Sequence, residues 1–310
     1  MKTPPLVFSF LLAAPALLFG QAAPPAARGP GPDPARIPMV LPEPANPGLP
    51  TLFLIGASAV RNGRDDGQGL GAAGQWGFGH TLPDFFDLTK INVVNRAVGG
   101  LSSRTYLTSG HWERTLALIK PGDFLLIQFG SNDDGNINDP ARARASLPGT
   151  GDEQKEIDNV LTKKHEVVHT HGWYLRKFVD DARAKGATAI VCSMPPHKVW
   201  DDNGRIVRAA NYINWTREVA QQEKIGFINL NEIVAARYDE LGHDKVMTLF
   251  PADEHDHTNL EGAKLVAGYV VAGLKLLKPN PLAPYFSAEA AAIAPADPAS
   301  LKATAPASAR

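Results

Sequence analysis

Short apolar runs alternate with longer amphipathic segments along the middle of the chain. The runs predict strands, and the longer segments repeat apolar residues with a helical period. Strands that alternate with helices are typical of βαβ units, in which helices cover both faces of a parallel sheet. The predicted strands are Thr51 to Gly56, Ile91 to Asn95, Phe124 to Phe129, Ala187 to Ser193 and Ile225 to Asn229. The predicted helices are Trp76 to Leu88, His111 to Ile119, His165 to Lys185, Val207 to Glu223, Asn231 to Leu241 and Leu260 to Leu277.

The composition is that of one large globular domain. The chain has 310 residues, of which 44% are hydrophobic and 20% charged, so a sizeable core can form without metals or disulfides. The formal net charge is −1 with acids and bases interspersed, which argues against a nucleic-acid partner. Cys192 is the only cysteine and lies in a predicted buried strand, where we expect it to act as a small hydrophobe.

The two ends of the chain differ from its middle. Residues 1–22 carry Lys2, an apolar stretch and small residues, which is the pattern of a secretory signal peptide. An uncleaved membrane anchor is the alternative. Residues 23–49 and the tail 287–310 are rich in Pro and Ala and are expected to be flexible or loosely draped over the domain, with the folded domain at 50–286. We therefore expect a secreted or periplasmic monomer with no membrane partner after signal cleavage.

Small and polar residues follow the predicted strands, at the sheet edge where open α/β proteins bind ligands. The first strand runs into "GAS", which ends in Ser58. Gly100 follows the second strand, and Asn132 lies in "GSND" after the third. The segment "LFPADEHDHTNLEGAKLVA", ahead of the last helix, holds two histidines among acids.

Together these residues match the needs of hydrolytic acyl transfer: a nucleophile, a base, an orienting acid and oxyanion donors. Ser58 is the candidate nucleophile and His257 the base. Glu254 or Asp253 is the acid that holds the imidazole. The candidate oxyanion donors are the amides of Ser58 and Gly100 and the side chain of Asn132.

As a set, "GAS", Gly100, "GSND" and "EHDHTN" resemble the four sequence blocks of the SGNH (GDSL-type) hydrolases, a family named for its Ser, Gly, Asn and His. The stretches "NRAVGGLSSRTY", "LPGTGDE" and "HTNLEGA" resemble its rhamnogalacturonan acetylesterase-like branch. The similarity runs from about Thr51 to Leu277. It implies a flavodoxin-like, three-layer α/β/α sandwich with a central parallel sheet. It also implies an acetylesterase that acts on acetylated plant cell-wall polysaccharide such as pectin, with no cofactor and no metal.

Three positions depart from the family pattern. Ala57 stands where the family usually has Asp, and Ser131 where this branch often has His. The family spacing Asp-x-x-His falls on Glu254, while Asp253 lies one residue too early. The identity of the acid is therefore open at this stage.

Other interpretations compete with this one. Residues 165–169, "HEVVH", match the zinc-protease pattern, which needs both histidines on one helix face and a third ligand that the sequence does not supply. His255 is the alternative to His257. The same chemistry could serve xylan, short acyl esters or lipid, and a binding module without catalysis would keep the fold alone. Trp200 and Arg104 are candidate sugar contacts beside an open groove, with packing as the equal alternative for Trp200.

Overall fold

The computed structural model describes residues 39–61, 63 and 70–296, which belong to one folded unit. The predicted signal peptide lies outside the described residues. Five parallel strands form the sheet in the order β2-β1-β3-β6-β7, which is the strand order of flavodoxin-like folds. Their bounds are Thr51–Gly56 (β1), Asn92–Asn95 (β2), Phe124–Gln128 (β3), Thr188–Cys192 (β6) and Gly226–Ile228 (β7). All five lie within the predicted strands, and the predicted parallel sheet is confirmed.

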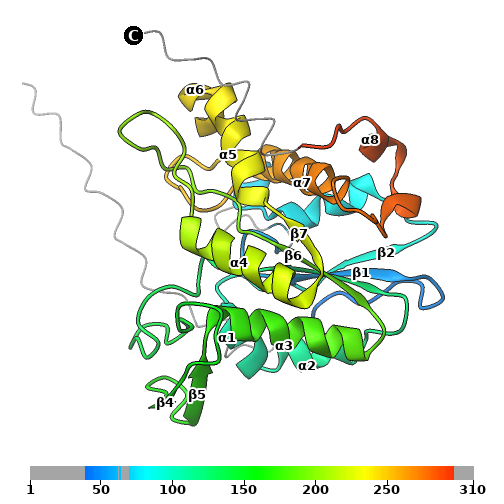
Figure 1. Ribbon diagram of the computed structural model, residues 1–310. Helices are drawn as coiled ribbons and strands as arrows, with labels where there is room; N and C mark the ends of the chain where they lie inside the picture. The colour runs from blue at the N-terminus through cyan, green and yellow to red at the C-terminus, as the bar shows by residue number, and fades with distance from the viewer. Residues whose placement is uncertain (1–38, 62, 64–69, 297–310) are drawn as a thin grey trace, which may run out of the picture. The chain divides into compact units, whose positions relative to one another are not determined.

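Side chains of each strand point alternately to the two faces of the sheet, and both faces are buried. Phe53 and Ile55 of β1 pack with one set of helices, whereas Leu52 and Leu54 pack with the other. Helices α1 to α4 cover the first face, and α5 and α7 cover the second, so the predicted three-layer sandwich is confirmed (Figure 1). The helix bounds are Ser103–Thr108 (α1), His111–Leu116 (α2), His171–Ala184 (α3), Ala210–Glu223 (α4), Leu230–Leu241 (α5), His243–Met247 (α6), Leu260–Leu274 (α7) and Ala288–Ala291 (α8).

The helix predicted from Trp76 to Leu88 is wrong. The segment instead forms two 3₁₀ turns, Phe78–His80 (η3) and Leu82–Phe85 (η4), and two more lie at Gly71–Ala73 (η2) and Ala283–Tyr285 (η5). Gly79 comes so close to the nucleophile loop that a Cβ there would lie 2.3 Å from the carbonyl oxygen of Val60. A regular helix with side chains at this position cannot approach the loop so closely, which explains the irregular path.

The helix predicted over residues 165–185 begins later than expected. Residues His165–His169 form strand β5, which pairs antiparallel with β4 (Gln154–Asp158), and α3 starts at His171. Thr170 caps α3 by accepting a hydrogen bond from the amide of Trp173. The hairpin of β4 and β5 extends below α1 in Figure 1. Pairing between β4 and β5 satisfies the backbone hydrogen bonds of this segment. The adjacent residues Val167 and Val168 are β-branched and favour a strand.

Two segments that composition marked as flexible are partly ordered. Arg96 donates hydrogen bonds to the carbonyl oxygens of Leu41 and Pro42, which ties residues 39–49 to the end of β2. In the tail, the amide of Ser287 donates to Phe85, and Ala290 of α8 is fully buried. Residues 287–291 of the tail therefore lie against the domain. Alanine side chains are small and apolar, so they can pack against the domain even in a segment without helical periodicity.

Cys192 ends β6 and is 1% exposed, so the prediction of a buried thiol is confirmed. Burial raises the pKa of this thiol far above its ordinary value. Among the described residues, no helix has both the length and the apolar character needed to cross a membrane.

Candidate active site

Ser58 lies in a tight turn at the carboxyl end of β1. A Cβ on Gly56 would lie 2.5 Å from the carbonyl oxygen of Gln128 on the neighbouring strand, so only glycine fits here. The carbonyl of Ala57 then accepts hydrogen bonds from the amides of Val60 and Arg61, which turns the chain. The turn leaves Ser58 half-buried at the rim of the sheet, where a ligand can reach its hydroxyl.

The structure brings His257 to Ser58 from the far end of the sequence. The Nε2 atom of His257 lies 2.8 Å from Ser58 Oγ, the distance of a hydrogen bond. His257 precedes α7, whose N-cap Asn259 accepts from the amide of Gly262. The helix cap therefore fixes the turn that carries the imidazole.

Glu254, not Asp253, is the carboxylate beside His257. The Nδ1 atom of His257 lies 3.0 Å from Glu254 Oε2, whereas Asp253 is exposed to solvent. The carboxylate lies off the direction of the ring N–H, so the distance is that of a hydrogen bond but the alignment is not ideal. Such contacts commonly tighten only when substrate binds.

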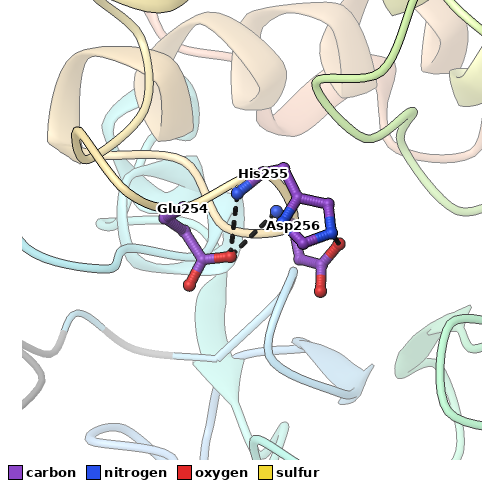
Figure 2. Close-up of side chains that lie close together, drawn as sticks. All are labelled: Glu254, His255 and Asp256. Atoms are coloured by element: carbon purple, nitrogen blue, oxygen red, sulfur yellow. Dashed lines mark hydrogen bonds and ion pairs between the residues drawn. The ribbon is translucent and has the colours of Figure 1, made fainter. Parts of the chain in front are cut away.

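The loop folds around the Glu254 carboxylate. Its Oε1 accepts from the amides of His255, at 3.1 Å, and Asp256, at 2.9 Å, as Figure 2 shows. Burial alone would raise the pKa of Glu254. The contact with His257 and the hydrogen bonds from the two amides outweigh that effect and lower the pKa to about 2 from 4.5. Glu254 is therefore ionised at neutral pH, as an acid that orients an imidazole must be.

The alternative base, His255, points elsewhere. Its Nε2 lies 3.5 Å from Asp256, which also contacts Nδ1 of His197 at 3.2 Å. Glu254, His255 and Asp256 have ligand atoms close enough to hold a metal ion. However, both oxygens of Glu254 already accept hydrogen bonds within the protein. These bonds explain the cluster as a turn built around a carboxylate.

The candidate oxyanion donors flank Ser58 on both sides. Strands β2 and β3 each pair with β1, and Gly100 and Asn132 follow them at the same edge of the sheet. Gly100 has a φ of 86°, a left-handed conformation that favours glycine. The Asn132 side chain donates to the carbonyl of Leu101 at 2.9 Å, which links the two loops.

Asp133, next to Asn132, is a buried anchor that the sequence did not single out. It is 1% exposed and accepts hydrogen bonds from the amide of Gly130, the amide and hydroxyl of Ser103 and the hydroxyl of Ser146. Its Oδ1 also lies 3.2 Å from Nδ1 of His171, which is fully buried. Burial would raise the pKa of Asp133, but His171 and Ser103 outweigh it and lower the pKa.

The zinc-protease interpretation of residues 165–169 requires a helix and fails because they form a strand. His165 and His169 are four residues apart, or about 13 Å along a strand. Glu166 pairs instead with Arg104 through two charge-assisted hydrogen bonds of 2.6 and 2.7 Å. This segment therefore anchors a hairpin.

Neither proposed sugar contact is placed for that role. Arg104 is fully buried and bound to Glu166, so it faces no ligand. Trp200 packs against the hydrophobic core on the α5 and α7 side, with its ring 4.6 Å from that of His243.

Side chains that hold Glu254 by hydrogen bonds were also missed. Gln75 donates to Glu254, and Arg61 donates to Gln75. No periodicity or spacing signals such contacts, because 179 residues separate Gln75 from Glu254. For Asp133, the "GSND" block itself was the available signal.

A family profile, several relatives and a solved structure match this chain. The sequence profile of the GDSL-like lipase/acylhydrolase family matches residues 55–265, which include Ser58 and His257. Rhamnogalacturonan acetylesterase of Emericella nidulans is 29% identical over 181 residues, or 58% of this chain and 72% of that protein. Probable rhamnogalacturonan acetylesterase YesY of Bacillus subtilis is 29% identical over 231 residues, or 73% and 93% of the two chains. The crystal structure of protein YxiM from Bacillus subtilis matches with 24% sequence identity and a TM-score of 0.57. The match covers 74% of this chain and 56% of that one, and it supports the fold alone.

Proposed function

The chain belongs to the GDSL-like lipase/acylhydrolase family, and from this premise we propose that it is a secreted serine acetylesterase acting on acetylated rhamnogalacturonan or related pectin. Family membership makes it a carboxylic ester hydrolase. The observation that carries the proposal is the contact of His257 with Ser58 on one ring nitrogen and Glu254 on the other.

In the first half of the reaction, Ser58 Oγ attacks the carbonyl carbon of the acetyl group. His257 Nε2, at 2.8 Å, accepts the hydroxyl proton as the new C–O bond forms. When the tetrahedral intermediate collapses, the imidazolium gives this proton to the departing sugar oxygen. The products of this half are the free sugar hydroxyl and an acetyl-Ser58 ester.

In the second half, water attacks the acetyl-Ser58 ester. His257 accepts a proton from the water and returns it to Ser58 Oγ, which releases acetate. Glu254, ionised at neutral pH, stabilises the imidazolium in both halves and keeps its Nδ1 protonated.

The negative charge of each tetrahedral intermediate needs donors. The amides of Ser58 and Gly100 and the side chain of Asn132 are assigned to this role. An Asn amide carries two N–H groups, and one is engaged with Leu101. The other is assigned to the oxyanion.

The substrate assignment is supported by the relatives named rhamnogalacturonan acetylesterase. The half-buried positions of Ser58 and His257 at the rim of the sheet suit a polymer that lies across the site. Release of acetate should be measured on rhamnogalacturonan, homogalacturonan and xylan, each acetylated. Faster release from xylan than from either pectic polymer would overturn the substrate assignment.

Replacing Ser58 with Ala tests the chemistry. Hydrolysis of an aryl acetate should fall by about 10⁴-fold or more, because no other group supplies the nucleophile. Turnover close to that of the unmodified protein would reject Ser58 as the nucleophile.

Export is also part of the proposal, on the basis of the charged and apolar order of residues 1–22, and a monomeric state is proposed with it. Expression of the full chain in a secreting bacterial host should give an extracytoplasmic protein that begins after residue 22. N-terminal sequencing and light scattering measure the two properties. Recovery of the intact chain in the membrane fraction would favour the uncleaved anchor.

A further inference from the structure

The Glu254 carboxylate has a partner beyond the catalytic turn. Its Oε1 accepts from two amides of its own loop, whereas its Oε2 lies between His257 Nδ1, at 3.0 Å, and the side-chain nitrogen of Gln75, at 2.6 Å. Gln75 lies before η3, far from Glu254 in sequence. The oxygen that faces the imidazole is thus also the oxygen that Gln75 holds.

Gln75 is itself fixed on two sides. Its Oε1 accepts from Arg61 Nη2 at 2.6 Å, and Arg61 follows Ser58 in the nucleophile turn. The next residue, Trp76, exchanges two hydrogen bonds of 2.8 Å with Thr258, which adjoins His257. Gln75 therefore lies at a fixed place relative to both the nucleophile and the base.

The chemistry of the two neighbours dictates how the Gln75 amide is oriented. A guanidinium carries only donors, and an ionised carboxylate carries only acceptors. The amide oxygen must therefore face Arg61, and the NH₂ group must face Glu254. In this orientation Arg61 donates to the amide oxygen, and the amide NH₂ donates to Glu254. The flipped amide would place donor against donor at Arg61 and acceptor against acceptor at Glu254.

A glutamate in this position needs such support more than an aspartate. It has one more rotatable bond, and its side chain is 19% exposed, so water competes for the carboxylate. A hydrogen bond to a charged group from a fixed donor limits this freedom.

We propose that Gln75 is a positioning residue of the esterase: it holds Glu254 Oε2 against His257 Nδ1, and Arg61 sets the direction of its amide. The proposal rests on the proposed function, because the position of Glu254 matters only if His257 is the base. It explains how a glutamate replaces the aspartate of the family spacing.

The main test is Gln75→Leu, which removes the donor at similar size. We expect kcat for an aryl acetate to fall by about 10- to 100-fold, the range for a hydrogen bond to a charged group, with KM changed by less than about twofold. In a Glu254→Ala background the same substitution should change kcat by less than about twofold. If Gln75 had only a structural role, Gln75→Leu would lower kcat by the same factor in both backgrounds.

The chain offers a matched control on its surface. Arg176 donates to Gln222, and Gln222 donates to Glu218, which is the same Arg–Gln–Glu chain on helices α3 and α4. Gln222→Leu should leave kcat and KM unchanged. Thermal melting of both leucine variants checks that the fold is retained.

A second variant, Gln75→Glu, gives a pH signature. Two carboxylates that share a site hold one proton tightly, so one of them becomes a donor as pH falls. The ratio of the kcat of this variant to that of the unmodified protein should rise as pH falls from about 8 to about 5. A ratio independent of pH would contradict the proposal.

The outcomes separate the two proposals. If Ser58→Ala or Glu254→Ala keeps full turnover, the triad fails and Gln75 has nothing to position. If both lose turnover while Gln75→Leu keeps the kcat of the unmodified protein, the esterase assignment stands and only the role of Gln75 is rejected. Equal losses in the two backgrounds also reject it.

Discussion

Two carboxylates of the candidate active site are held in different ways. Asp133, on the oxyanion side, is almost fully buried, and its partners come from the start of α1, from the loop after β3 and from the start of α3. Glu254, on the acid side, is partly exposed and held by its own turn and by Gln75. The difference indicates that the oxyanion side is part of the core, whereas the acid side is assembled at the surface. Loss of Asp133 should therefore affect folding, and loss of Glu254 should affect turnover.

Of the changes at these two carboxylates, Glu254→Gln should have the largest effect, because it removes the charge at constant size. Turnover of an aryl acetate should fall by about 10²- to 10⁴-fold, because an amide does not stabilise the imidazolium or enforce its tautomer. The melting temperature should stay within a few degrees, since the side chain lies near solvent. A large loss of stability would remove the contrast between the two sides.

The matched change on the other side is Asp133→Asn. An amide cannot accept at both of its positions, so at least one buried donor around Asp133 loses its acceptor, which costs about 1–3 kcal/mol and lowers the melting temperature by roughly 5 °C for a domain of this size. Calorimetry measures the effect. A melting temperature equal to that of the unmodified protein would show that Asp133 is not a structural anchor.

Acid should destabilise the protein through both carboxylates. The folded pKa of Glu254 is about 2 against an ordinary 4.5, and the pKa of Asp133 is also lowered. A group with a depressed folded pKa contributes stability above its unfolded pKa and loses it as pH falls. The melting temperature should therefore fall as pH is lowered from about 4.5 to about 2, and less steeply in Glu254→Gln. An identical acid slope in that variant would contradict the ionised state of Glu254.

The smallest effect should come from Asp253→Ala. Asp253 is exposed, and the carboxylate at His257 is that of Glu254. Turnover should stay within about twofold of that of the unmodified protein, and the melting temperature within a few degrees. This is the usual range for a change at an exposed side chain. If this variant loses turnover while Glu254→Ala retains it, the acid has been assigned to the wrong residue.

The sequence predicted the sheet because its signal is local. Each strand is a short apolar run bounded by turn residues, and β1, β2 and β3 lie within the predicted segments. Ser58 could be proposed from its place at a strand end and His257 from its place ahead of the last helix, and the structure brings them to 2.8 Å. Because parallel strands share one edge, Ser58, Gly100 and Asn132 could be placed together from their order along the chain.

Features that depend on contacts distant in sequence were not predictable. The "HEVVH" segment fits either a strand or a helix by periodicity, and its pairing with β4 decides the outcome. Gly79 rules out a helix only because the Val60 carbonyl lies against it. The choice between Glu254 and Asp253 depended on the path of a turn, and a one-residue difference in spacing could not resolve it.

The single, buried cysteine makes the protein suitable for site-specific thiol labelling. Cys192 lies inside the core at 1% exposure, and its raised pKa keeps the thiol protonated, so it should not react with maleimide or iodoacetamide in the folded state. A cysteine introduced at an exposed site near the nucleophile would then be the only reactive thiol in the 310 residues. A fluorophore or spin label attached there could report the arrival of a polymer without prior removal of the native cysteine.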